Sequence, residues 1–138
     1  MTNIQFIFNV SDIKNLTYKI VCRYFIRHRS CFVFLSDEET IAQFSDDLWG
    51  REKFSFLPHE INKSDIFNKI SLGHNSELMD DVIINGTNKN VNKFSRYQKL
   101  YELVGINESD KKIARERFLF YKDRGYEIEA TDFVNFKH

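Results

Sequence analysis

Apolar runs alternate with amphipathic stretches over the first fifty residues, and this alternation limits the possible folds more than any other feature of the chain. Residues 4–10 form a short apolar run that predicts a strand. Ser11 then opens a stretch whose apolar residues recur at helical spacing, at Ile13, Leu16, Ile20 and Tyr24. The chain is therefore predicted to begin with a strand followed by a helix.

The run CFVFL at residues 31–35 is apolar at every position. A strand of this kind is buried on both faces, which is typical of a parallel sheet covered by helices on each side. Residues 36–39 match a capping box, and the helix that they begin has an apolar stripe formed by Ile41, Phe44 and Leu48. The order strand, helix, strand, helix favours a three-layer α/β/α fold with an open, mostly parallel sheet of Rossmann-like topology.

The rest of the chain has weaker patterns and is expected to complete the same sheet. Three further strands are predicted at residues 66–72, 82–84 and 100–104, with a short helix at 94–97 and an edge strand or coil at 128–133. The 138 residues contain no internal repeat and no linker. We therefore expect a single domain over residues 1–138.

Charge and cysteine content argue against several classes of protein. Lysine plus arginine and aspartate plus glutamate both number 20, so the formal net charge is zero, which disfavours direct, tight nucleic-acid binding. Cys22 and Cys31 share no metal-ligand spacing with a histidine and are interpreted as reduced thiols of a cytoplasmic protein. No apolar run approaches the ~20 residues of a membrane span, so no membrane association is expected.

Basic and aromatic residues gather on a third predicted helix, at residues 111–125. Asn107 is a candidate N-cap, and Gly125 suits the left-handed position that ends a helix. At 100° per residue, one stripe places three cations around an aromatic ring: Lys111, Arg115, Phe118 and Lys122. The stripe is either a docking surface or an ordinary solvated helix face.

The other side of this helix is expected to face the core. It carries four apolar or aromatic residues, Ile113, Ala114, Phe120 and Tyr121. Arg117 and Arg124 lie at its margin, where the side-chain stems can pack while the guanidinium groups reach a carboxylate or the solvent. Both arginines are interpreted as structural.

Motifs for catalysis and cofactor binding are missing from the sequence. A dinucleotide-binding fold needs a glycine-rich turn after its first strand, but residues 9–12 contain no glycine, and neither GxGxxG nor GxxxxGK[ST] occurs. There is no GxSxG motif, and the four histidines share no metal spacing. We therefore expect no catalytic residue, no metal site and no cofactor.

Trp49 and Phe56 belong to an aromatic segment that is predicted to form a loop after the second helix. If Trp49 and Phe56 are exposed beside Arg51, they match the composition of protein-binding hot spots. Packed beneath the loop, they would instead form a small satellite core. The residues alone leave both interpretations open.

Two segments together resemble the family of chi subunits of bacterial DNA polymerase III, accessory proteins of the clamp-loader complex. One runs from DLW at residues 47–49 to SFLPH at 55–59. The other runs from Lys111 through ARERF at 114–118 to the Gly-Tyr pair at 125–126. Order and spacing agree over nearly the whole chain, although residues 60–95 are similar only as a strand pattern.

The resemblance implies a three-layer α/β domain that binds two partners. One is the psi subunit of the clamp-loader complex, for which Trp49 and Phe56 would form the binding patch. The other is the acidic C-terminal tail of single-stranded DNA-binding protein. The implied tail pocket contains Val104, Lys111, Arg115, Phe118 and Lys122.

The implied function is that of a non-catalytic adaptor in DNA replication, which links the clamp-loader complex to single-stranded DNA-binding protein. Some family members carry a lysine where this chain has Leu119, a departure that bears on tail affinity. The alternative is a nucleotide-dependent enzyme of Rossmann-like fold.

Overall fold

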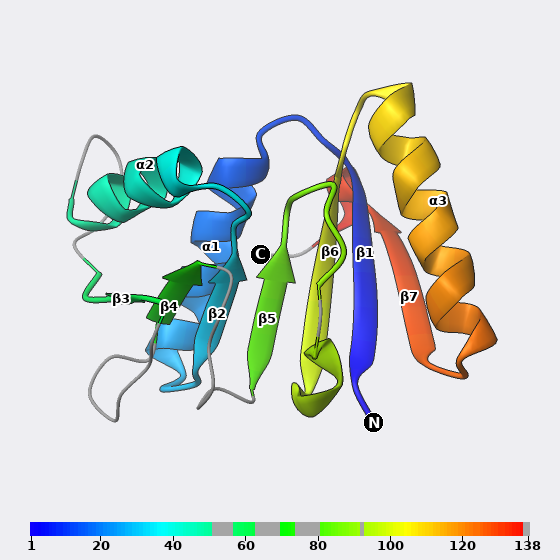
Figure 1. Cartoon of the computed structure of the whole chain (residues 1–138), viewed down its shortest axis with the longest axis horizontal. Helices are drawn as coiled ribbons and strands as arrows, with labels where there is room; N and C mark the ends of the chain where they lie inside the picture. Colours follow the sequence, from blue (N-terminus) through cyan, green and yellow to red (C-terminus); the bar gives the residue numbers. More distant parts are fainter. Residues whose placement is uncertain (51–56, 63–69, 74–80, 92, 137–138) are drawn as a thin grey trace.

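A computed structural model describes residues 1–50, 57–62, 70–73, 81–91 and 93–136. Its centre is a seven-stranded sheet in the order β3-β4-β2-β5-β6-β1-β7, with every neighbouring pair parallel (Figure 1). The strands are β1 (Asn3–Val10), β2 (Cys31–Phe34), β3 (Glu60–Ile61), β4 (Ile70–Gly73), β5 (Val82–Asn85), β6 (Lys99–Gly105) and β7 (Glu127–Asp132). The predicted α/β class with an open, mostly parallel sheet is confirmed.

Within the described residues, three α-helices cover the two faces of the sheet. Helices α1 (Ile13–Ile26) and α2 (Glu38–Leu48) pack into one apolar cluster, and α3 (Glu108–Asp123) packs into a second cluster on the opposite face. The short 3-10 helix η1 (Phe94–Arg96) joins the α3 side, and η2 (Phe133–Asn135) returns to the α1 side. The described chain thus has three layers, with α2 and α3 at opposite ends of the sheet (Figure 1).

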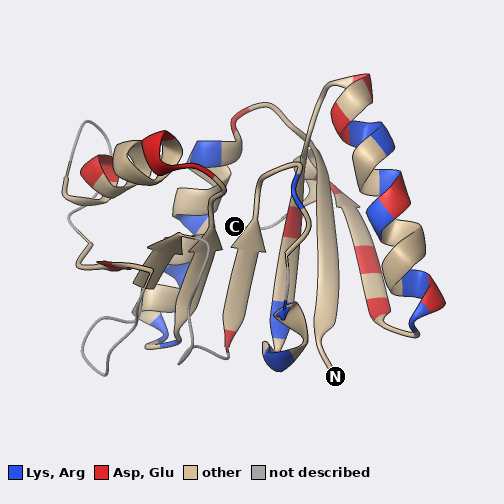
Figure 2. Ribbon diagram, viewed as in Figure 1, with Lys and Arg blue, Asp and Glu red and all other residues tan. Residues whose placement is uncertain are grey.

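The central strands are buried on both faces because helices lie on each side. Alternate residues of β6 show this pattern: Tyr101 and Leu103 belong to the α1 side, whereas Leu100 and Val104 belong to the α3 side. Few charged residues lie on the central strands. Most charged residues of the described chain lie on the helices and at the margins of the sheet (Figure 2). Glu102 on β6 is one of the few on the central strands, and its carboxylate is fully buried.

The helix starts differ in detail from the prediction. The N-caps of α1 and α2 are Asp12 and Asp37, one residue later than the serines that the sequence favoured, and their carboxylates accept the backbone N–H groups of Asn15 and Thr40. Aspartate suits this position because it also meets the positive end of the helix dipole. Asn107 is the N-cap of α3 without a side-chain cap hydrogen bond.

The strand expected at residues 66–72 lies partly outside the described residues, and its described part is β4. Phe120 was expected in the core, but its side chain is 48% exposed and its ring lies 4.2 Å below the guanidinium of Arg124. This expectation was wrong because only one narrow stripe of α3 contacts the sheet, and the neighbouring Tyr121 occupies it.

Within the described residues, no helix is long and apolar enough to cross a membrane.

Candidate functional site

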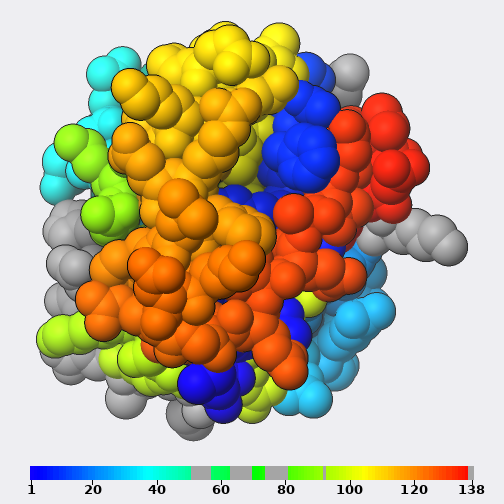
Figure 3. All heavy atoms as spheres, turned by 90° about the vertical axis from the view of Figure 1, so that its right-hand side faces the viewer, coloured from blue at the N-terminus to red at the C-terminus, as the bar shows by residue number. Residues whose placement is uncertain are grey.

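A groove of about 550 Å³ lies between α3 and the edge of the sheet formed by β1 and β7 (Figure 3). Its walls are mostly apolar, with polar groups confined to two cations and one amide. The lining residues are Phe6, Phe8, Asn9, Val104, Lys111, Ala114, Arg115, Phe118, Leu119 and Ala130. The groove is open to solvent and is lined by three aromatic rings, those of Phe6, Phe8 and Phe118, which suits a peptide with apolar side chains.

Small residues and one backbone irregularity create the groove. Ala114 on α3 and Ala130 on β7 leave space between helix and sheet, while the ring of Phe118 rests 5.6 Å from that of Phe6 and closes the floor. The pairing of β1 with β6 shifts register between Ile7 and Val10. Such a bulge re-aims side chains, and here it brings two consecutive residues, Phe8 and Asn9, to the groove.

The cations lie on the helical wall. Lys111 and Arg115 occupy successive turns of α3, and Leu119 continues the same row one turn further. The Arg115 side chain is 67% exposed, and its guanidinium is 3.9 Å from the carboxylate of Glu108. An exposed contact at this distance contributes little, so the guanidinium is available to a ligand.

The structure brings together four of the five residues predicted for the tail pocket: Val104, Lys111, Arg115 and Phe118. Lys122 does not line the groove and is an exposed residue of the last helical turn. Sequence reasoning missed the floor and the far wall, Phe6, Phe8, Asn9 and Ala130. Phe6 and Phe8 alternate along β1, which gives a signal for one face of a sheet but not for which helix covers that face.

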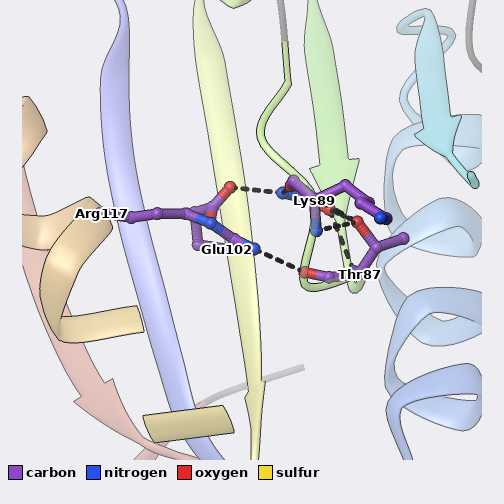
Figure 4. A network of polar contacts seen from close by, with 5 residues as sticks. Thr87, Lys89, Glu102 and Arg117 are labelled. Carbon is purple, nitrogen blue, oxygen red and sulfur yellow. Dashed lines mark hydrogen bonds and ion pairs between the residues drawn. The ribbon is translucent and has the colours of Figure 1, made fainter. Parts of the chain in front are cut away.

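On the other flank of α3, Arg117 enters the protein and forms a buried ion pair (Figure 4). Its Nη1 donates to the Glu102 carboxylate at 2.6 Å, and its Nη2 donates to the Thr87 carbonyl at 3.0 Å. The Asn85 amide donates to the second Glu102 oxygen at 2.8 Å. Burial raises the pKa of Glu102, while Arg117 acts in the opposite direction. The prediction that Arg117 is structural agrees with this geometry.

Trp49 follows α2 at the far end of the sheet. Its side chain is 47% exposed, and its ring lies 4.4 Å from that of the buried His59. His59 Nδ1 faces the Leu57 carbonyl at 2.9 Å and therefore donates, so Nε2 accepts from the Ser45 hydroxyl at 2.7 Å. The indole ring thus packs against a histidine that two hydrogen bonds hold in place, while much of the indole surface is exposed to solvent. Phe56 lies outside the described residues.

The helix N-termini at the carboxyl ends of the strands, where many α/β proteins bind phosphate, carry this chain's own carboxylates. Asp12 and Asp37 cap α1 and α2, and Asp110 in the first turn of α3 accepts amide hydrogens from Asn88 and Asn107. A phosphate would be repelled at each of these positions. Among the described residues, no cluster of three or more histidine, cysteine or acidic side chains is suited to a metal ion.

In the part of the chain that the structure describes, the fold is therefore an α/β domain with a peptide-sized groove and without a phosphate loop. A family model described as DNA polymerase III chi subunit, HolC, matches residues 1–129, so the chain belongs to the family of DNA polymerase III chi subunits. It is also similar to DNA polymerase III subunit chi of Pseudomonas aeruginosa, with 24% identity over 100 residues, which span 71% of this chain and 70% of the relative. The family is that of an accessory subunit of the polymerase.

Proposed function

We propose that this chain is a non-catalytic, cytoplasmic adaptor in DNA replication that links the clamp-loader complex, through psi, to the acidic C-terminal tail of single-stranded DNA-binding protein. The observation that carries the proposal is the groove in which Lys111 and Arg115 stand beside Phe118 and Val104. A peptide terminus that combines a carboxylate with an apolar side chain needs both kinds of group at one place.

The two cations suit the charge of such a ligand. Arg115 has an exposed, planar guanidinium that forms paired hydrogen bonds with a carboxylate, and Lys111 adds a second positive charge one turn away. Phe118 and Val104 offer an apolar surface to the terminal side chain. We assign the carboxylate to Arg115 and the terminal side chain to the aromatic floor.

The second partner, psi, is assigned to the surface around Trp49. A large aromatic side chain that is half exposed, yet rests on a fixed histidine, is typical of an interface anchor. Helices α2 and α3 lie at opposite ends of the sheet (Figure 1), so the two partners would not compete for one surface. An adaptor requires this separation.

Calorimetric titration with a synthetic acidic tail peptide tests the proposal. Wild-type protein is expected to bind in the micromolar range, with affinity that falls as salt rises. Arg115→Ala is expected to lose most of this binding, whereas Lys112→Ala, which removes an exposed cation outside the groove, serves as the matched control. Equal binding by wild type and Arg115→Ala would overturn the site assignment.

A thermal-shift panel of nucleotides tests the enzyme alternative. Stabilisation by the tail peptide without stabilisation by any nucleotide supports the adaptor. Stabilisation by a nucleotide that Arg115→Ala leaves unchanged would place a second ligand elsewhere and contradict a purely adaptor role.

A further inference from the structure

The formal net charge of zero conceals an uneven distribution of charge between the two ends of the strands. The carboxyl ends of the strands lie beside the helix N-termini, which carry Asp12, Asp37 and Asp110. The amino ends lie beside the last turn of α1, the short helix η1 and the start of β6, where lysine and arginine gather (Figure 2). Six cations form this surface, which we call the basic edge: Arg23, Arg27, Arg29, Lys93, Arg96 and Lys99.

Asp81 joins the two halves of the basic edge. Its carboxylate accepts the backbone N–H of Ser30 at 2.8 Å and lies 3.6 Å from the guanidinium of Arg29, just after α1. Its backbone carbonyl accepts the N–H groups of Gln98 and Lys99, both at 3.1 Å, at the start of β6. Within residues 23–30, 81 and 93–99, this is the only carboxylate, and internal contacts already occupy it. The two groups of cations therefore lie side by side with little negative charge between them.

The basic edge passes from one face of the sheet to the other. Lys99 lies on the α1 side, with its Nζ 5.0 Å from the centre of the Tyr101 ring. Arg96 lies on the α3 side, with its guanidinium 5.3 Å from the centre of the Tyr97 ring, and Tyr97 stacks in turn on Phe32. Aromatic rings of the core thus support the cations on both faces.

Helix stability does not account for the whole basic edge. A cation in the last turn of a helix meets the negative end of the dipole, which explains Arg23 in α1. Arg29, Arg96 and Lys99 lie outside the α-helices. Burial lowers the pKa of the Lys99 amine, and the nearby charge of Arg23 acts in the same direction. The cations therefore repel one another in the free protein, and a bound anion would relieve this repulsion.

We propose that the basic edge contacts the phosphate backbone of single-stranded DNA directly, in a salt-sensitive and sequence-independent interaction. Four of its six cations are arginines, which form paired hydrogen bonds with phosphate. A flexible single strand can follow the cations from one face of the sheet to the other. Duplex DNA, whose persistence length is about 150 base pairs, can meet only one face. This inference goes beyond the proposed function, in which the chain reaches DNA only through single-stranded DNA-binding protein.

The proposed tail site would make a weak DNA contact sufficient. The groove beside α3 shares no lining residue with the basic edge, so both can be occupied together. Because the chain is neutral overall, the dissociation constant for DNA alone should be about 100 μM at physiological salt. A strand that is tethered through its binding protein reaches an effective concentration of about 1 mM, which is enough to occupy such a contact. The acidic helix N-termini at the other end of the strands repel phosphate and so confine DNA to the basic edge.

Fluorescence anisotropy with a labelled oligothymidylate of about 16 nucleotides tests the basic edge. The logarithm of the association constant should fall with the logarithm of salt concentration with a slope of about −2, since each of about three neutralised phosphates contributes about −0.7. Arg27→Glu combined with Arg96→Glu reverses one exposed cation in each half of the basic edge. This double variant should bind at least about tenfold more weakly at low salt, with a shallower slope.

The matched control is Lys89→Glu combined with Lys112→Glu. It changes the total charge by the same amount, at exposed positions just after β5 and early in α3, near the carboxyl ends of the strands. Its affinity for the oligothymidylate should stay within about twofold of wild type, because charges away from the contact add little. Circular dichroism and cooperative urea unfolding check that both double variants fold.

Equal weakening by the two double variants would show an effect of total charge alone and would overturn the inference, as would absence of binding at low salt. Duplex DNA of the same length that binds as tightly as the single strand would overturn it too. Displacement of the oligothymidylate by polyglutamate, at the same concentration of charges as unlabelled oligothymidylate requires, would assign the surface to an acidic protein instead. DNA binding that depends on the basic edge, in a protein without Arg115-dependent tail binding, would support this inference and overturn the proposed function.

Discussion

Arg115 and Arg117 are two residues apart on α3, and the two flanks of the helix use them in opposite ways. Arg117 is buried and pairs with a fully buried carboxylate, whereas Arg115 is exposed and has only a long contact with an exposed one. One arginine holds the helix on the sheet, and the other is available to a ligand. A helix rich in basic residues can thus carry both buried and exposed cations, and only the exposed ones are candidates for binding a ligand.

The buried flank should show the largest effect on stability. Arg117→Met leaves Glu102 as a buried charge without its cationic partner, and the free energy of unfolding should fall by about 3–5 kcal/mol. Urea denaturation followed by circular dichroism measures the change. The double variant Arg117→Met with Glu102→Leu should recover most of the stability, because both charges are then removed. A double variant as unstable as the single one would show that the pair is not the source of the effect.

The same variant should show a stronger pH dependence of stability than the wild type. Burial holds the pKa of Glu102 above its ordinary value of 4.5, and without Arg117 no nearby cation opposes this shift. The folded state then binds a proton more readily than the unfolded state, so stability should fall as pH rises from that ordinary value through the raised pKa. Arg117→Met should accordingly be more stable at pH 5 than at pH 7. A loss of stability on acidification over this interval would contradict the assignment.

The exposed flank should show the reverse pattern. Arg115→Ala should change the free energy of unfolding by less than about 0.5 kcal/mol, since its side chain is exposed. The same substitution should weaken binding of the tail peptide by about tenfold or more. If Arg115→Ala lost as much stability as Arg117→Met, Arg115 would be a structural residue and the two flanks of α3 would not differ in role.

Trp49 extends the comparison to the far end of the sheet. Trp49→Ala should reduce psi binding by about tenfold, because truncation removes an exposed anchor, and tail affinity should stay unchanged. Co-purification with psi and peptide titration measure the two effects separately. Loss of both activities together would point to misfolding rather than to two surfaces.

The smallest effect is expected at Cys31. Complete burial raises the pKa of its thiol, so the group stays protonated and shielded. Thiol reagents should modify it in native protein only as fast as the protein unfolds. Rapid modification of Cys31 in native protein would show that the sheet opens locally at β2.

The sequence alone predicted the elements with strong periodicity. The unbroken apolar run at β2 and the helical spacing of α1 and α2 identified a parallel sheet, because burial on both faces leaves a clear pattern. β3 was missed because two residues, Glu60 and Ile61, carry no period. Part of the predicted tail pocket lies on one helix and could be found from spacing. The position of Asn9 in the groove depends instead on a strand bulge that no spacing reveals.

The claim that the exposed flank of α3 binds a peptide carboxylate is tested most directly by removing that carboxylate. The tail peptide and its C-terminal amide are titrated into wild type and Arg115→Ala by calorimetry. Amidation should weaken wild-type binding by about tenfold and should have almost no further effect on Arg115→Ala. Equal affinity of wild type for the two peptides would contradict the assignment of the terminal carboxylate to Arg115.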